Sequence, residues 1–279
     1  MQAARVYLHM CVLIVSMISS TAFQTHKLRV VSKATQKFTV APPQVPSRRL
    51  VMVTADASKR HSTILGNYNE FLKDYKVVLA SQSPRRLEIM ELMGLKNGKN
   101  LEVQVSSFEE NLEKSSFEIP GMYAQVNAQY KAFDIARRVF STPQEKVLVV
   151  GSDTIVEHEG VILEKPVDTK DAHRMLSALS GATHLVHSGV AVFTDAEDQD
   201  KPLFAFYETT EVKFVELTDN EIWNYIRTGE PMDKSGSYGI QGVGGQFVER
   251  LAGCYFNVMG FPMHRFSRNV ASKILSSEN

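Results

Sequence analysis

Residues 77–92 of this 279-residue chain have the sequence VVLASQSPRRLEIMEL, in which two structural patterns meet. The apolar run Val77–Ala80 is rich in β-branched residues and is typical of a buried strand. Ser83 and Pro84 then have the residue types favoured at the N-cap and first position of a helix, and Gly94 marks its end. This stretch therefore predicts a strand that leads directly into a helix N-terminus.

Two hydroxyls and two guanidiniums, those of Ser81, Ser83, Arg85 and Arg86, crowd the predicted strand-to-helix junction. The free backbone N–H groups of a helix N-terminus carry partial positive charge and favour an anion such as a phosphate. Arginine side chains add permanently charged, bidentate donors. The same spacing also fits a capped surface helix with two solvated arginines, so the junction alone leaves both interpretations open.

Strand-like and helix-like patterns alternate along the rest of the body, which indicates an α/β fold. Val147–Val150 is a continuous apolar run, as expected for a strand buried on both faces of a sheet. The polar sequence Gly151–Thr154 follows and is predicted to form a loop at the end of that strand. Further strands are expected at 101–105, 187–193, 205–215 and near 247–248, a hairpin at 155–163, and helices at 121–140, 168–179, 218–227 and 263–275.

Three predicted loops leave strands and carry polar side chains: the junction at 81–86, Ser152–Thr154 and Glu164–Pro166. In open α/β sheets, ligands bind outside the carboxyl ends of the strands. The arginines and Lys165 suit a triphosphate, and a carboxylate such as Asp153 beside them can hold a metal ion or activate water. The residues alone thus indicate an enzyme that acts on phosphates.

Charge is unevenly distributed along the chain. The 31 basic and 31 acidic residues balance, but residues 1–55 contain seven of the basic and none of the acidic ones, which leaves an acidic body. An acidic body argues against nucleic acid as a partner. The two cysteines, Cys11 and Cys254, show no zinc-binding spacing, and a single thiol in the body suits a reducing compartment.

Residues 1–55 have the composition of a cleavable targeting leader. In residues 1–22, a short apolar core at Val12–Ile18 precedes small residues up to Ala22, a signal-peptide pattern too short for a permanent membrane span. Residues 23–55 are basic, acid-free and rich in Ser and Thr, as in transit peptides. Together they resemble the two-part leader of plastids acquired by secondary endosymbiosis. Secretion, a mitochondrial leader, or an upstream-start artefact on a cytoplasmic protein are the alternatives. Residues 56–75 form a polar lead-in to a domain at 76–279.

Five motifs, in this order, resemble those of the Maf family of nucleoside triphosphate pyrophosphatases: LASQSPRR at 79–86, GSDT at 151–154, EKP at 164–166, LSG at 179–181 and DKSGSYGIQG at 233–242. The resemblance implies an elongated single α/β domain with a central mixed β-sheet, flanking helices and a nucleotide-binding cleft, similar to inosine triphosphate pyrophosphatases. It also implies cleavage of a nucleoside triphosphate to the monophosphate and pyrophosphate, and a homodimer.

Carried onto this sequence, the resemblance implies a role for individual residues. Asp153 would accept a proton from the attacking water, and Glu110 with Asp153 would hold a divalent cation, Mg²⁺ or Mn²⁺. From spacing alone, Lys131 is an ordinary helix-surface lysine and Glu110 a solvated loop acid. The substrate-binding residues would be Ser81, Ser83, Arg85, Arg86, Lys131, Thr154, Lys165 and Gln241.

The family also divides by substrate. Its dTTP/UTP branch carries Arg, Thr and Gln at three specificity positions, occupied here by Arg85, Thr154 and Gln241, whereas the 7-methyl-GTP branch has Trp, Gln and Glu. An amide such as that of Gln241 can donate to and accept from the edge of a pyrimidine. We therefore expect hydrolysis of dTTP and UTP, and modified pyrimidine nucleotides would fit the same pocket. A 7-methyl-GTP or purine nucleotide pyrophosphatase, and a non-catalytic nucleotide-binding regulator of cell division, are the alternatives.

Overall fold

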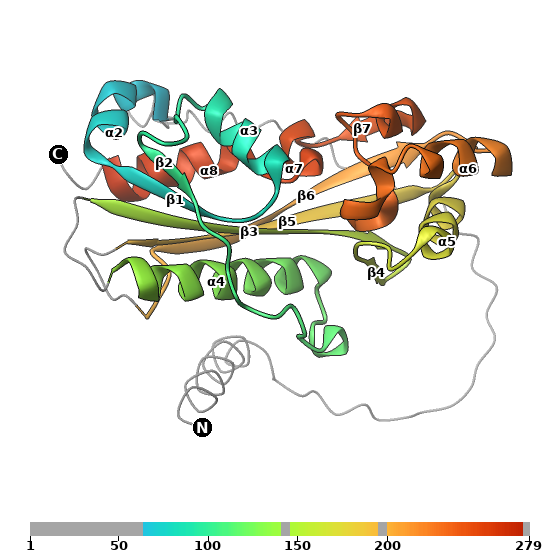
Figure 1. Cartoon of the computed structure of the whole chain (residues 1–279), viewed down its shortest axis with the longest axis horizontal. Coiled ribbons are helices and arrows are strands. Elements are labelled where there is room, and N and C mark those ends of the chain that lie inside the picture. Colours follow the sequence, from blue (N-terminus) through green and yellow to red (C-terminus); the bar gives the residue numbers. More distant parts are fainter. Residues whose placement is uncertain (1–63, 141–145, 195–199, 276–279) are drawn as a thin grey trace, which may run out of the picture. The chain divides into compact units, whose positions relative to one another are not determined.

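A seven-stranded mixed sheet runs through the described part of the chain, residues 64–140, 146–194 and 200–275 of a computed structural model (Figure 1). The strand order is β2-β1-β3-β5-β6-β7, and β4 pairs with β3. The β1–β2 and β1–β3 pairs are parallel, and the other pairs are antiparallel. The described residues belong to one unit, Ala55–Asn279. The predicted leader, residues 1–55, lies outside the described residues.

The helices and strands alternate along the chain, as the sequence predicts. The lead-in segment ends in a short 3₁₀ turn, Ile64–Asn67, and in α2. The helices are α2 (Tyr68–Asp74), α3 (Pro84–Leu92), α4 (Pro120–Val139), α5 (Thr169–Leu179), α6 (Asp219–Arg227), α7 (Tyr255–Met259) and α8 (Met263–Val270). The strands are β1 (Lys76–Ala80), β2 (Leu101–Val103), β3 (Val147–His158), β4 (Val161–Leu163), β5 (Thr183–Thr194), β6 (Phe204–Phe214) and β7 (Val248–Ala252).

The central strands are buried on both faces because helices cover each side of the sheet (Figure 1). In β1, Val77 and Leu79 belong to the core shared with α3 and α8, whereas Val78 and Ala80 belong to the core under α4. β3 divides its side chains in the same way over Val147–Val150. Successive strand residues face opposite sides, so a continuous apolar run is what such a strand requires.

Helix α4 lies unusually close to the sheet because two glycines leave room for it. A Cβ on Gly151 of β3 would lie 2.2 Å from the carbonyl oxygen of Ala128, and a Cβ on Gly189 of β5 would lie 2.3 Å from the backbone of Ala124. Any other residue at either position would push the helix away. The two glycines therefore fix the depth of α4, and with it the position of Lys131.

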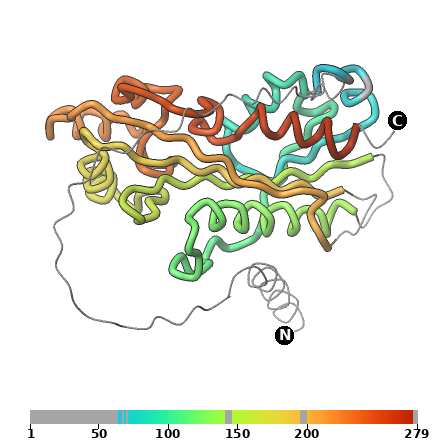
Figure 2. The backbone as a smooth tube through the Cα atoms, turned by 180° about the vertical axis from the view of Figure 1, so that it is seen from behind, coloured from blue at the N-terminus to red at the C-terminus, as the bar shows by residue number. Residues whose placement is uncertain are grey.

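The long strands β3, β5 and β6 continue past this region into another apolar cluster, as seen from behind in Figure 2. There Val156, Val186 and Val212 pack against side chains of α5 and α6. A capping box closes the start of α6: Thr218 and Glu221 exchange side-chain and backbone hydrogen bonds. One sheet thus joins two apolar regions, and the middle of β3 lies between them.

The α/β fold with a central mixed sheet and flanking helices is confirmed. The predicted loop at Gly151–Thr154 is wrong, because β3 runs without interruption from Val147 to His158 and pairs with β5 over ten residues. The predicted strand at 101–105 ends at Val103. Among the helices of the described residues, none is long and apolar enough to span a membrane.

Candidate active site

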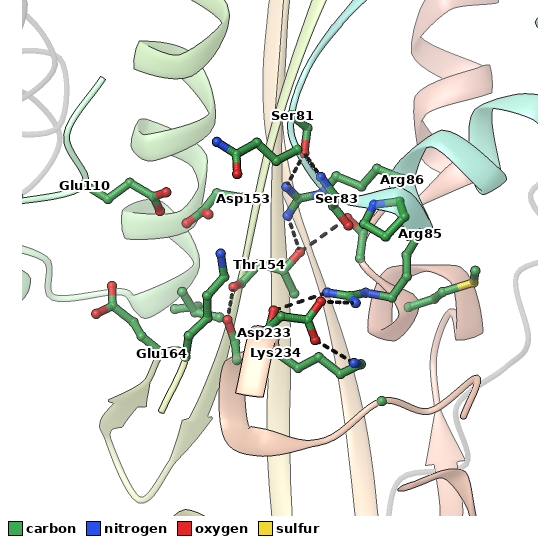
Figure 3. Close-up of a pocket in the computed structure, with 18 of the residues that line it drawn as sticks. Ser81, Ser83, Arg85, Arg86, Glu110, Asp153, Thr154, Glu164, Asp233 and Lys234 are labelled. Carbon is green, nitrogen blue, oxygen red and sulfur yellow. Dashed lines mark hydrogen bonds and ion pairs between the residues drawn. The ribbon is translucent and has the colours of Figure 1, made fainter. Parts of the chain in front are cut away.

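A pocket of about 460 Å³ opens where β1, the N-terminus of α3, the middle of β3 and the segment after α6 meet (Figure 3). Its volume lies in the range of sites for small ligands. Glu110, Asp153 and Glu164 lie on one side of it, and the two neighbouring arginines lie on the other together with Asp233 (Figure 3). The residues predicted for the site that line this pocket are Ser81, Ser83, Arg85, Arg86, Glu110, Lys131, Asp153, Thr154, Lys165 and Gln241.

Arg86 is buried at the strand-to-helix junction and is bonded to three parts of the chain. Its Nε donates to the carbonyl oxygen of Gly260 at 2.9 Å, and its terminal nitrogens donate to Ser81 Oγ and Thr154 Oγ1, each at 3.0 Å. Burial lowers the pKa of Arg86, although the nearby Asp153 opposes that effect, and a guanidinium stays charged throughout the ordinary pH range. An N–H bond on each terminal nitrogen remains for a ligand.

The interpretation of the junction as a capped surface helix is wrong for Arg86, which shares the buried face of α3 with Ile89 and Met90. The predicted N-cap is also only partly present. Ser83 occupies the N-cap position, but its side chain makes no capping hydrogen bond, and its backbone N–H donates instead to Ser81 Oγ at 3.2 Å. Ser81 therefore accepts two hydrogen bonds, which fix its hydroxyl beside Arg86.

Lys131 lies between two carboxylates. Its Nζ is 2.8 Å from Asp153 Oδ1 and 2.8 Å from Glu110 Oε2. Asp153 is buried in β3, Lys131 projects from α4, and Glu110 lies on the loop before α4. These three residues are far apart in the sequence and lie on different elements, yet in the fold the Lys131 ammonium contacts both carboxylates. The cluster places a carboxylate, fixed by its strand, at the centre of the pocket.

The position of Asp153 corrects the expectation that this carboxylate ends a strand. Ser152 and Thr154 on either side of it pair with β5 in the regular register. Gly151 allows α4 to pack against this part of β3, so the strand continues through a sequence that looks like a turn. A carboxylate in the middle of a strand has less freedom than one on a loop, which suits a group that must keep a fixed direction.

Glu164 and Lys165 follow β4 on the carboxylate side of the pocket. Glu164 accepts a hydrogen bond from the Tyr123 hydroxyl at 2.7 Å and contacts Lys114 Nζ at 2.6 Å (Figure 3 shows Glu164). The exposed Lys165 lines the pocket. Burial, and then the bond to Glu164, raises the pKa of Tyr123 well above its usual value, so this phenol remains a hydrogen-bond donor.

Arg85 contacts the opposite wall of the pocket. Its NH1 lies 2.9 Å from Asp233 Oδ2, and Asp233 Oδ1 also lies 2.6 Å from Lys234 Nζ (Figure 3). Burial would raise the pKa of Asp233, but hydrogen bonds from Lys234 and Arg85 outweigh it and lower that pKa. Sequence reasoning quoted Asp233 and Lys234 within a motif without assigning them a role, because only the fold brings Arg85 to them.

Thr154 and Gln241 complete the set of predicted specificity positions. Thr154 Oγ1 accepts from Arg86 and lies 2.9 Å from Ser188 Oγ, whose own proton is donated to the carbonyl oxygen of Asn257. The Thr154 hydroxyl proton is therefore directed toward Ser188 or toward the carbonyl oxygen of Gly260. Gln241 is exposed on the loop after Tyr238 and lines the pocket.

The donors at the centre of the pocket fit a hard divalent cation only in part. Glu110 and Asp153 converge on one cation already, the ammonium of Lys131. Within residues 64–140, 146–194 and 200–275, no group of three or more His, Cys, Asp or Glu side chains is arranged to hold a metal ion. Mg²⁺ commonly binds through one or two carboxylates plus water and substrate phosphates, which is the donor set available here.

The chain is similar to known proteins over most of the described residues. The model of the family described as "Maf-like protein" matches residues 76–272. A "dTTP/UTP pyrophosphatase" of Clostridium perfringens is 45% identical over 190 residues, which is 68% of this chain and 93% of that protein. A "probable bifunctional dTTP/UTP pyrophosphatase/methyltransferase protein" of Homo sapiens is 47% identical over 199 residues, 70% of this chain, and this chain covers 31% of it.

A solved structure of a nucleoside-triphosphatase, described as a dITP/XTP pyrophosphatase, from Mycobacterium abscessus is also similar. It aligns with a TM-score of 0.33 and 12% sequence identity, and the alignment covers 73% of this chain and 97% of the other. The family match spans most of the residues that build the sheet and the pocket, and the clostridial relative is matched over nearly its whole length. The chain therefore belongs to the Maf-like family.

Proposed function

We propose that this protein is a nucleoside triphosphate pyrophosphatase that hydrolyses dTTP and UTP to the monophosphate and pyrophosphate. One observation carries the proposal: a buried arginine at a helix N-terminus, a carboxylate on a rigid strand and an exposed glutamine all line a single pocket. The relatives whose names specify dTTP/UTP pyrophosphatase activity support the choice of substrate.

The triphosphate binds at the junction end of the pocket in this proposal. Arg86, already fixed by three protein acceptors, directs its remaining N–H bonds at phosphate oxygens, while Arg85 and Lys165 add charge that can move to meet the ligand. Fixed donors cost little reorganisation when charge develops in the transition state. Ser81 and Ser83 lie at the same junction and complete the polar lining.

Asp153 is the proposed general base, which takes a proton from the water that cleaves the bond between the α- and β-phosphates. Its carboxylate is buried and contacts Lys131, so its direction is fixed relative to the arginines. A bound Mg²⁺ or Mn²⁺ would be held by Glu110 and Asp153 together with phosphate oxygens, and it would neutralise charge on the leaving pyrophosphate. Lys131 occupies the space between these carboxylates and balances their charge.

Selection of the base falls to the three specificity positions. The Gln241 amide can donate and accept at once, as the carbonyl and N–H edge of thymine or uracil requires. Arg85 and Thr154 line the same pocket and orient the nucleotide in it. Modified pyrimidine nucleotides present the same edge, which would make removal of such nucleotides, a house-cleaning role, part of the function.

The purified chain with Mg²⁺ and a panel of nucleotides tests the proposal. Release of pyrophosphate should be fastest from dTTP and UTP and slower from dGTP and 7-methyl-GTP. Asp153→Asn should lower kcat by about 10²- to 10⁴-fold, the usual contribution of a general base. Asp219→Asn, at the exposed start of α6, is the matched control and should keep full activity.

Three outcomes would reject the proposal. Faster turnover of 7-methyl-GTP or a purine nucleotide would reassign the substrate. Wild-type rates in Asp153→Asn would remove the base from the mechanism. Nucleotide binding without turnover would favour a regulatory role instead.

We further propose that residues 1–55 direct the protein to a plastid of the secondary-endosymbiosis type. Residues 1–22 would act as a signal sequence and 23–55 as a transit sequence, to judge from their charge and apolar core. A fluorescent reporter fused to residues 1–55 should accumulate in the plastid. Accumulation in the secretory pathway or the cytoplasm would contradict this.

We also propose a homodimer, as the family resemblance implies. Light scattering of the purified chain in solution should give twice the mass of the 31.3 kDa chain or of its processed form. A single-chain mass would contradict it.

A further inference from the structure

Glu230 begins the segment that follows α6, and backbone and side-chain donors surround its carboxylate. Oε2 accepts from the backbone N–H of Val243 at 2.9 Å, and Oε1 accepts from the Tyr225 hydroxyl at 2.8 Å and from the backbone N–H of Gly244 at 3.2 Å. Both carboxylate oxygens of Glu230 thus bind backbone groups that lie 13 and 14 residues further along the chain.

Tyr225, on the buried face of α6, extends the same network to the other side of the loop. Its hydroxyl donates to Glu230 and accepts from the backbone N–H of Gly239 at 3.1 Å. Together Tyr225 and Glu230 bind the backbone at residues 239, 243 and 244, on both sides of Gln241. The loop between these points has no regular secondary structure apart from tight turns.

The loop fits closely around the carboxylate, which shows that the contact is built into the fold. A Cβ on Gly242 would lie 2.4 Å from Glu230 Oε1, and a Cβ on Gly244 would lie 2.5 Å from the Tyr225 hydroxyl. Glycines at these points let the backbone approach the anion but leave the loop with high conformational freedom. Ile240 packs against the core and tight turns close within the loop, and Glu230 adds the anchor points on the C-terminal side of Gln241.

The charge states of the two side chains favour this arrangement. Burial would raise the pKa of Glu230, but bonds from Val243, Tyr225 and Gly244 outweigh it and lower that pKa, so the acceptor stays ionised. Burial, and then the bond to Glu230, raises the pKa of Tyr225, so the phenol stays a donor. Neither side chain lines the pocket, whereas Tyr238, Gly239 and Gln241 of the bound segment do.

We propose that Glu230, assisted by Tyr225, is a positioning residue that fixes the loop 239–244 and thereby directs the Gln241 amide at the base. The inference rests on the proposed function, in which Gln241 recognises a pyrimidine. An amide discriminates between bases only if its donor and acceptor are held in place, because a freely rotating amide satisfies either edge. Glu230 therefore determines substrate preference without touching the substrate.

A double-mutant cycle tests this on the full chain with Mg²⁺. Glu230→Gln preserves the shape of the side chain but replaces one carboxylate oxygen with an NH₂ group. That group cannot accept a hydrogen bond from a loop N–H. It should raise KM for dTTP and UTP about tenfold, leave kcat within about twofold and reduce the preference over dGTP about tenfold. In a Gln241→Ala background, where the preference is already lost, Glu230→Gln should change KM by less than about twofold.

Two further variants separate positioning from general stability. Glu221→Gln is the matched control: this carboxylate also bonds backbone N–H, that of Thr218 at 2.7 Å, but it caps the start of α6. It should lower the melting temperature and leave the nucleotide preference unchanged. Tyr225→Phe removes the bonds to Glu230 and Gly239 while keeping the buried ring, and should reproduce part of the Glu230→Gln effect in a stable protein.

The results separate this inference from the proposed function. If Gln241→Ala removes the preference and Glu230→Gln does not, the role of Glu230 is overturned and that of Gln241 stands. If the KM changes of Glu230→Gln and Gln241→Ala multiply in the double variant, the two residues act independently and the role of Glu230 is also overturned. A fall in kcat with unchanged KM in Glu230→Gln overturns it as well. If Gln241→Ala keeps the preference, base recognition by Gln241 fails and the inference fails with it.

Discussion

The two ends of the pocket are built in different ways. At the junction end, regular strands and helices supply the site, and Arg86 is buried with acceptors directly after β1, on β3 and on the turn after α7. At the loop end, Gln241 is exposed on a glycine-rich segment, and its position depends on a carboxylate behind the pocket. At the junction end, the buried surroundings of Arg86 hold its charge in place. At the loop end, a few hydrogen bonds hold the shape of the loop that carries Gln241.

This difference corresponds to what each part of a nucleotide requires. Every triphosphate carries the same charge, so the junction can be rigid and specific for phosphate alone. Bases differ in the pattern of donors and acceptors, so recognition at the loop end depends on the direction of one amide. Variants of Arg86 should therefore affect all nucleotides equally, whereas variants of the loop end, and of the specificity positions Arg85 and Thr154, should change the preference among them.

Arg86→Lys should have the largest effect and should act on every nucleotide. A lysine keeps the charge but cannot bond Gly260, Ser81 and Thr154 together, so buried acceptors lose their partner. We expect kcat/KM for dTTP, UTP and dGTP to fall by about 10³-fold, about 4 kcal/mol, as for loss of fixed transition-state donors. Arg250→Lys, in an exposed pair with Glu211, is the control. A loss confined to dTTP and UTP would contradict the assignment of Arg86 to the phosphates.

Lys131→Met tests the charge balance at the centre of the pocket. Removal of the ammonium leaves the buried Asp153 without its partner and beside Glu110, so the free energy of unfolding at pH 7 should fall by about 3 kcal/mol. Urea denaturation measures this. Because the ammonium then no longer competes with a cation for the two carboxylates, Mg²⁺ should raise the melting temperature of the variant more than that of the wild type.

A control for this charge balance lies on the loop beyond Glu110. Lys114→Met breaks a contact with Glu164 in which both side chains are partly exposed, so it should cost less than about 1 kcal/mol. Equal losses in the two variants would show that the environment of Asp153 does not depend on Lys131.

The sequence predicts the junction better than the loop end, for a physical reason. The strand Val77–Ala80 and the helix start at Pro84 are set by local propensities, and both appear where expected. Arg86 was interpretable as a surface residue because one of its acceptors, Gly260, lies 174 residues away. A local signal did exist, since Arg86 precedes Ile89 and Met90 by helical spacing and shares their buried face.

Asp153 and Glu230 show two limits of sequence reasoning. Gly151–Thr154 looks like a turn, but Gly151 serves the close approach of α4, and pairing with β5 keeps the segment extended. Glu230 has no recognisable signal, because its partners are mainly backbone N–H groups whose positions arise only after the loop folds. The roles of Glu110 and Lys131 came from family resemblance alone, and the fold explains their proximity through the depth of α4.

Acidification should destabilise the fold through a buried histidine that contacts the loop end. His184 of β5 is buried, accepts or donates a hydrogen bond at 2.9 Å with the Tyr238 hydroxyl of the loop end, and has its pKa lowered to about 3 by burial and then by His158. Its unfolded pKa is about 6.5, so the unfolded chain binds a proton first as the pH falls. Stability from this group is complete above about pH 6.5 and is lost toward pH 3.

Urea denaturation at pH 6.5 and pH 5 measures this contribution. His184 alone should account for a loss of about 2 kcal/mol between these values. His184→Gln should lose less than the wild type over the same interval, by about that amount, although His187, whose pKa burial also lowers, keeps part of the slope. At pH 8, where a histidine is neutral in both states, the variant should show only its packing cost. An unchanged slope would place the acid sensitivity elsewhere.

Asp233→Asn should have the smallest effect, because Asp233 joins the two ends through an exposed contact with Arg85. Asn keeps an oxygen for Arg85, and the backbone carbonyl of residue 233 still accepts from it, so unfolding should change by less than about 1 kcal/mol. Loss of one negative charge beside the phosphates should lower KM for every nucleotide about twofold at low salt and not at about 0.3 M KCl. Glu249→Gln, on exposed β7, is the control. A rise in KM for dTTP alone would instead give Asp233 a part in base selection, through its contact with Arg85 or through the loop end.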